Sequence, residues 1–190
     1  MKTFEIRLRL NLILLIVFTL LLTNCKKEKE TVLITPNISV ELPKNYKYFV
    51  SHSTGSDRTN PELIINYENY NYAATINNDE IYITKTITDE YDGLDFNEKA
   101  AKLKILTKGF ARGFASSTVI DPTSKEKEIN GLAQSEFNFN FEENDDLFIL
   151  YGRLIIQDTN VILFGYKTKF PSTNGSIKDK DEFFNSVKYN

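Results

Sequence analysis

The sequence predicts an α+β domain, in which an antiparallel sheet of about five to seven strands is covered by a long central helix and a short C-terminal helix. Apolar and polar residues alternate over several short segments, one helical stripe interrupts them, and two hairpin signals stand close together in the second half. The chain also holds 10 Tyr and 14 Phe but no Trp, a composition that favours strands.

The early strands are short. Residues 38–42 alternate apolar and polar side chains before Pro43 ends the run, and residues 63–67 follow as a second strand. Turn-forming residues fill 51–61 and predict a loop. Ile81, Ile83 and Ile87 follow a period of two, broken only by Lys85, which predicts a further strand.

The central helix is expected at about 95–115. Asp95 can cap its first turn, and Glu98 stands three residues later, as in a capping box. The apolar positions that follow recur at spacings of three and four, which places them on one helix face. They are Phe96, Ala100, Leu103, Leu106, Phe110 and Phe114.

Two hairpins are expected next. Asn130-Gly131 lies between the segments 125–129 and 132–143 and is a strong turn signal. Phe137, Phe139 and Phe141 then alternate with asparagines and should share one face. Strands at 147–156 and 161–169 flank the second turn, and Gly152 indicates a bulge or a close approach. Residues of about 179–188 predict the C-terminal helix.

The N-terminus predicts a location. Lys2, Arg7 and Arg9 precede an apolar run at 10–22, as in a secretory signal peptide. Leu22-Thr23-Asn24-Cys25 then resembles the lipobox of bacterial lipoproteins, although Asn24 stands where Gly, Ala or Ser is usual. The resemblance implies cleavage before Cys25, a diacylglycerol on its thiol and an acyl chain, commonly palmitate, on its amine.

Two other interpretations of this segment stay open. Cys25, the single cysteine, could be an incidental thiol, or the apolar run could remain as a membrane anchor, although it is shorter than the roughly 20 residues that span a bilayer. The lipoprotein interpretation divides the chain into a signal peptide at 1–24, a lipidated cysteine and flexible tether at 25–35, and one globular domain at 36–190. The charged residues after Cys25 favour the outer membrane.

The order of elements resembles the PsbP-like α/β/α sandwich. An early strand ending at a proline, ISVELP at 38–43, precedes the central helix, and the chain closes on a helix ending in FFNSVK at 183–188. The resemblance implies a binding or assembly role.

Catalytic motifs are not evident. The single histidine, His52, stands in a polar stretch, and the sequence has neither a nucleophile elbow nor a phosphate loop. The net charge of −3 gives no reason to expect nucleic acid, and we expect no cofactor and no metal. Acidic residues at 142–146 predict a solvated turn or, alternatively, a weak site for a divalent cation.

Tyr67, Tyr70 and Tyr72 are the candidate recognition residues. Tyrosine combines contact area with a polar tip, so this cluster predicts a patch for a protein or glycan of the envelope, although half-buried sheet positions also explain it. The expected function is therefore a non-enzymatic binding or accessory domain anchored at the outer membrane. The alternative is a hydrolase that uses only carboxylates, which requires a cleft with paired carboxylates.

Overall fold

The structure, a computed structural model, describes residues 28–56, 64–114 and 122–190. In these ranges a small antiparallel sheet has the order β1-β2-β10, and a larger one has the order β3-β4-β5-β9-β8-β7-β6. The strands are β1 (Lys29–Thr35), β2 (Ile38–Pro43), β3 (Lys47–Ser56), β4 (Ile64–Ile76), β5 (Asp79–Ile87), β6 (Thr123–Ile129), β7 (Leu132–Glu143), β8 (Asp146–Gln157), β9 (Asn160–Lys169) and β10 (Lys188–Tyr189). The helices are η1 (Asp89–Tyr91), α2 (Phe96–Phe114) and α3 (Asn174–Ser186).

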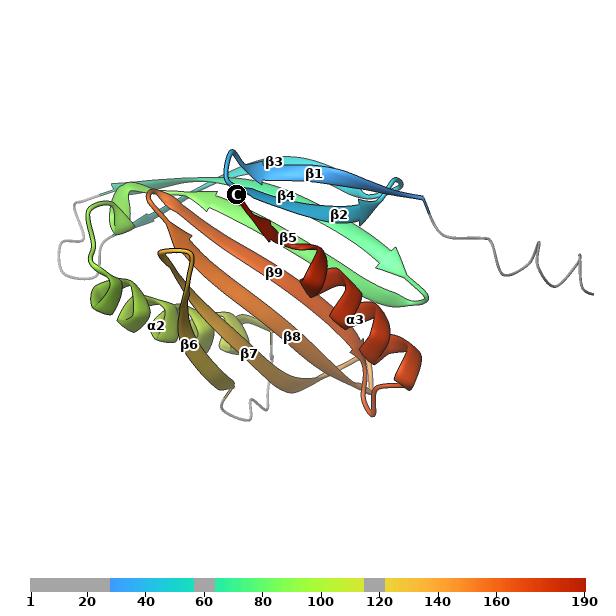
Figure 1. Ribbon diagram of the computed structural model, residues 1–190. Coiled ribbons are helices and arrows are strands. Elements are labelled where there is room, and N and C mark those ends of the chain that lie inside the picture. Colours follow the sequence, from blue (N-terminus) through green and yellow to red (C-terminus); the bar gives the residue numbers. More distant parts are fainter. Residues whose placement is uncertain (1–27, 57–63, 115–121) are drawn as a thin grey trace, which may run out of the picture.

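The larger sheet is covered on its two faces by different elements (Figure 1). Helix α2 contacts β6, β7 and β8 on one face. Strand β2 of the small sheet contacts β4, and helix α3 contacts both β2 and β9. The small sheet and α3 therefore lie together over the opposite face.

Each face has its own apolar core. Ile38, Val40 and Leu42 of β2 join Ile81, Ile83, Phe164 and Phe183 in the core under the small sheet and α3. Leu103 and Ala111 of α2 pack in the other core against Phe137, Phe139 and Phe141. Because successive strand residues point to opposite faces, the central strand β9 contributes Phe164 to one core and Leu163 to the other.

Several local predictions are confirmed. The Asp95 amide donates to Glu98 Oε2 at 2.9 Å, and the Glu98 amide donates to Asp95 Oδ1 at 2.9 Å, which forms the expected capping box. Asn130 and Gly131 both have positive φ and connect β6 to β7. A tight turn whose two central residues have positive φ suits a hairpin, because the twist of the turn matches the twist of the two strands.

The predicted fold class is wrong. Strands make up 59% of the structure and form two sheets, and the helices are short. Helices were expected at about 95–115 and 179–188, and α2 and α3 lie near those positions, but α2 covers only the β6–β8 end of the sheet. The small sheet provides the cover that the sequence analysis assigned to helices, because β1 and β2 bury Val32, Ile34 and Ile38 against the larger sheet.

Two expected irregular segments form strands instead. Of the tether expected at 25–35, residues 29–35 form β1 and pair with β2, whereas residues 25–27 lie outside the described residues. Residues 51–56 of the expected loop continue β3, paired along β4. Within the described ranges, no helix is long and apolar enough to cross a membrane.

Candidate functional site

The three candidate tyrosines lie on one strand but not on one face. Tyr70 pairs with Val50 and Tyr72 pairs with Tyr48 across β3 and β4, whereas Tyr67 pairs with Ser53. Since alternate strand residues share a face, Tyr70 and Tyr72 lie together and Tyr67 lies on the opposite face. The predicted patch is therefore divided by the sheet.

A different tyrosine cluster forms around Tyr72. Its ring centroid lies 4.9 Å from that of Tyr48 and 6.0 Å from that of Tyr46, both in tilted geometry. Tilted ring pairs at such distances are favourable because of the charge distribution of the rings. We call the group on this face the tyrosine surface; its members are Tyr46, Tyr48, Val50, Tyr70, Tyr72 and Lys85.

Part of the tyrosine surface packs against the core, and part of it is exposed to solvent. Tyr46 and Tyr72 pack against the core under the small sheet, so their rings are held from below. Tyr48 is 50% exposed and Val50 is 42% exposed at the β3 margin. Exposed aromatic and aliphatic groups beside fixed rings suit partner contact, because little side-chain freedom remains to be lost on binding.

The tyrosine surface carries one lysine and a neighbouring carboxylate. Lys85 Nζ lies 4.1 Å from the centroid of the Tyr70 ring, a cation–π contact. Among the described residues, Lys85 makes no ion pair; Lys47 makes none either, but it lies on the opposite face, with Phe49. The nearby Glu68 carboxylate instead accepts a hydrogen bond from the Tyr70 hydroxyl, and this bond raises the pKa of Tyr70 above its ordinary value.

Tyr46 is held in a similar way. Burial raises the pKa of its hydroxyl, and a hydrogen bond with the Glu30 carboxylate raises it further. In both tyrosines the single hydroxyl proton is donated to a carboxylate, Glu30 for Tyr46 and Glu68 for Tyr70. Tyr46 and Tyr48 were not predicted as site residues, because residues 47–56 carry no clear strand pattern and Tyr46 directly precedes them.

The face that carries Tyr67 is polar. Thr84 Oγ1 donates to Asn71 Oδ1 at 3.1 Å, and Asn71 Nδ2 donates to Ser51 Oγ at 3.3 Å. In a second row beside it, Thr86 Oγ1 donates to Asn69 Oδ1 at 2.8 Å, and Asn69 Nδ2 donates to Ser53 Oγ at 3.1 Å. These cross-strand hydrogen bonds occupy the side chains of this face and stabilise the pairing of β3, β4 and β5.

The acidic residues at 142–146 lie at the turn between β7 and β8, which residues 144–145 form. Asn144 and Asp145 have positive φ between β7 and β8. Asp146 forms an ion pair with Lys169 at 2.7 Å, and Glu143 forms one with Lys167. In the ranges that the structure describes, no group of three or more His, Cys, Asp or Glu side chains is arranged to hold a metal ion. This arrangement supports the structural interpretation of the turn.

A separate groove of about 390 Å³ lies between α3 and strands β6 to β8. Arg153, whose side chain is 14% exposed, lines it and forms a 3.1 Å ion pair with Glu136. Burial raises the pKa of the Glu136 carboxyl, but the Lys127 hydrogen bond and the Arg153 charge outweigh burial, so this pKa lies below its ordinary value. Glu136 is therefore an ionised partner of basic residues, which is unsuitable for a general acid at neutral pH.

Arg153 was not predicted as a site residue, although its charge within the apolar segment LFILYGRLII is a usable signal. Arg153 Nη1 donates to the Phe184 carbonyl oxygen at 3.2 Å and ties α3 to the sheet. Cys25, the candidate lipidation residue, lies outside the described residues.

No protein-family model matches this sequence, and no curated protein matches it. Among solved structures it is similar to that of LpqN, described as involved in cell envelope biogenesis of Mycobacterium tuberculosis, with 12% identity, a TM-score of 0.44, and coverage of 85% of this chain and 90% of that chain. PA94 of Pseudomonas aeruginosa, a protein of unknown function, has 10% identity, a TM-score of 0.38, and coverage of 82% and 94%. At these levels of similarity, neither structure assigns a function.

Proposed function

We propose that this chain is a lipid-anchored protein of the bacterial cell envelope whose domain binds another protein through the tyrosine surface and carries out no catalysis. The single observation that carries the binding role is the cluster of Tyr48, Tyr70 and Tyr72 with Lys85, partly exposed above a packed core. Such clusters of tyrosine with one cation are typical of binding hot spots.

The anchor rests on Cys25 and the apolar run before it. One acyl chain binds a membrane reversibly, whereas several chains hold a protein firmly, since each buried methylene contributes about 0.8 kcal/mol. Strand β1 begins at Lys29, so at most about 14 Å of extended chain would separate it from Cys25. The domain would therefore lie close to the outer membrane, with β1 as its membrane-proximal strand.

Metabolic labelling tests the anchor. In a bacterium fed labelled palmitate, we expect label on the wild-type chain and none on Cys25→Ala, with the wild type in the outer-membrane fraction. An unlabelled wild-type chain, or equal labelling of both chains, contradicts the anchor.

Partner capture tests the binding role. Detergent extracts of membranes should yield a co-purifying protein with the wild type and at least about tenfold less with Tyr48→Ala/Tyr70→Ala, because both rings contribute contact area. Tyr67→Ala is the matched control, since Tyr67 lies on the same strand but on the other face.

Equal capture by the double variant would contradict the role of the tyrosine surface. If capture is lost when glycans are removed enzymatically, and the wild-type chain binds the purified glycan, then the partner is a glycan and not a protein.

The non-enzymatic role is supported by the surroundings of the groove carboxylates. Glu136 binds Arg153 and Lys127, and Asp181 contacts Lys180 at 3.0 Å. A carboxylate hydrolase needs one carboxyl group with a raised pKa to act as the acid. We therefore expect Glu136→Gln to leave the biological activity of the chain unchanged.

A further inference from the structure

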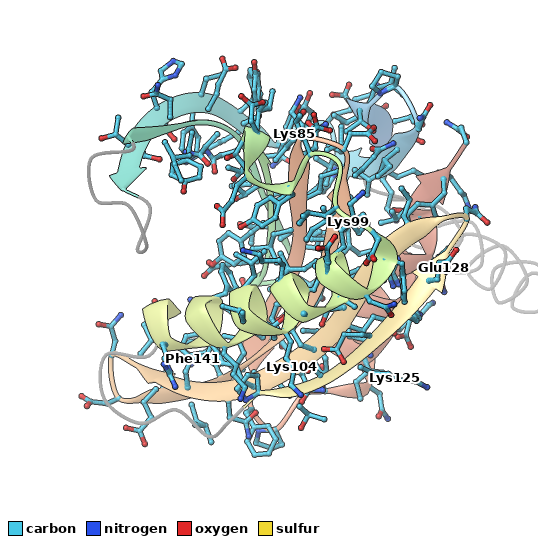
Figure 2. All side chains as sticks on the ribbon, turned by 90° about the vertical axis from the view of Figure 1, so that its left-hand side faces the viewer. Lys85, Lys99, Lys104, Lys125, Glu128 and Phe141 are labelled. Atoms are coloured by element: carbon cyan, nitrogen blue, oxygen red, sulfur yellow. The ribbon has the colours of Figure 1, made fainter. Side chains whose placement is uncertain are left out.

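The two edges of the larger sheet differ in chemistry. At one edge, β6 presents four consecutive charged residues, Lys125, Glu126, Lys127 and Glu128, two of which Figure 2 labels. Charges of this kind protect an edge strand from pairing with other chains. At the other edge, β3 spans ten residues and carries Lys47 as its only lysine, arginine or carboxylate.

Near its beginning, at residues 48–50, strand β3 has apolar side chains on both faces. Tyr48 and Val50 point to the face of the tyrosine surface, and Phe49 points to the opposite face. Phe49 is 54% exposed, more than either neighbour. A partner that only covered the tyrosine surface would leave Phe49 in water, whereas a partner strand lying alongside β3 would contact both faces.

The backbone of β3 is also available. Its residues pair with β4 on one side, and in the described part of the chain no strand pairs with its other side. In an antiparallel pair, alternate residues direct their N–H and C=O groups away from the partner. These outward groups form a row that an extended chain can use.

We propose that an extended, acidic segment of another protein adds to the sheet as a strand beside β3. The inference rests on the proposed function and specifies how the partner binds. Main-chain hydrogen bonds to β3 supply affinity, and alternate side chains of the segment contact Tyr48 and Val50 on one face and Phe49 on the other.

The charge of the segment follows from Lys47. Lys47 begins β3 at the free edge, on the face of Phe49, and makes no ion pair in the described ranges. Lys85 lies farther away, on β5, with β4 between it and β3. Carboxylates on the added strand would therefore meet Lys47, which would repel lysines on that strand.

A synthetic peptide of alternating valine and glutamate tests the proposal on the whole chain purified in detergent. We expect it to bind, and to slow hydrogen exchange of β3 amides in exchange mass spectrometry. The same peptide with lysine in place of glutamate should bind at least about tenfold more weakly. Methylation of alternate peptide nitrogens should abolish binding, because it removes the main-chain donors.

Variants of the chain locate the contact. Phe49→Ala and Tyr48→Ala should each weaken peptide binding by about tenfold. Phe170→Ala removes another exposed ring, 44% exposed and outside β3, and should leave binding unchanged.

Strand addition is overturned if the acidic peptide does not bind, or if the N-methylated peptide binds equally well. If either peptide result is obtained but Tyr48→Ala/Tyr70→Ala still loses its membrane partner, then the tyrosine surface is the binding site and only strand addition is wrong. If that partner is retained instead, the proposed function fails as well.

Discussion

Gly152 lies directly opposite Phe137 in strands β8 and β7, and the phenylalanine ring lies over the glycine. A Cβ at position 152 would lie 2.6 Å from Phe137 Cε2 and closer still to Cζ. The ring therefore occupies the space that a side chain would need, and this contact lets Phe137 join the core beneath α2. The same pair explains the close approach that the sequence predicts at this glycine.

Gly152→Ala should destabilise the domain by about 2 kcal/mol, because Phe137 must move within a packed core. Gly165 is the matched control: it lies opposite Gly152 on β9, and a Cβ there would have its nearest neighbours at 3.7 Å. Urea unfolding should place Gly165→Ala close to the wild type. Equal losses in the two variants would contradict the role of the ring.

Tyr166 should contribute to stability through its hydroxyl. The hydroxyl donates to Asp79 Oδ2 at 2.7 Å where both residues are buried, and burial, together with this bond, raises the pKa of Tyr166. Tyr166→Phe should lower the free energy of unfolding by about 1–3 kcal/mol, because it leaves a buried carboxylate without this donor. Tyr48→Phe, at an exposed ring, should change it little. An unaltered urea midpoint for Tyr166→Phe would contradict the expectation.

Lys167 should matter more through its stem than through its charge. Its side chain is 5% exposed and reaches Glu80 and Glu143, whose own side chains are 42% and 45% exposed. Its Nζ lies 4.6 Å from the Phe148 ring centroid. Lys167→Met should cost less than about 1 kcal/mol, because the stem stays packed and both carboxylates can turn to water.

Lys167→Ala, in contrast, removes the buried methylenes and should cost about 2 kcal/mol. Thermal unfolding of Lys167→Met and Lys167→Ala at one pH shows whether the methylenes or the charge of Lys167 contribute more to stability. A loss as large for methionine as for alanine would show that the charge dominates.

Glu136 should make the free energy of unfolding depend on pH in the acidic range. Its pKa is lowered in the folded state, so its contribution is fully present above the ordinary value of 4.5 and is lost as the pH falls through the lowered value. Its side chain is 38% exposed, so the contribution is under about 1 kcal/mol. Glu136→Gln should be slightly less stable at pH 7 and should lose less stability below pH 4.5. Parallel stability curves for the two chains would contradict this.

The second half of the fold follows closely from the sequence. The Asn130-Gly131 turn, the alternation of Phe137, Phe139 and Phe141, and the capping box of Asp95 are local signals, and each has the expected structure. Local patterns suffice here because turn angles and side-chain alternation are properties of short segments.

The first half was harder because its strands lack such patterns. Residues 29–35 begin within a charged run that favoured a tether, and 51–56 consist of turn-forming residues that are strands only because β4 pairs with them. The division of the tyrosines was visible in principle, since positions 67 and 70 have opposite parity in one continuous strand. The packing of a second sheet on the first depends on long-range contacts that no local pattern reveals.

A photo-reactive residue at position 48 or 67 tests the tyrosine surface as the binding site most directly. The two positions lie on adjacent strands and opposite faces. Irradiation of intact cells should cross-link position 48, but not position 67, to one partner protein, and the Cys25→Ala change should remove that product by releasing the chain from the membrane. Cross-linking from position 67 alone, or from neither position, would contradict the account.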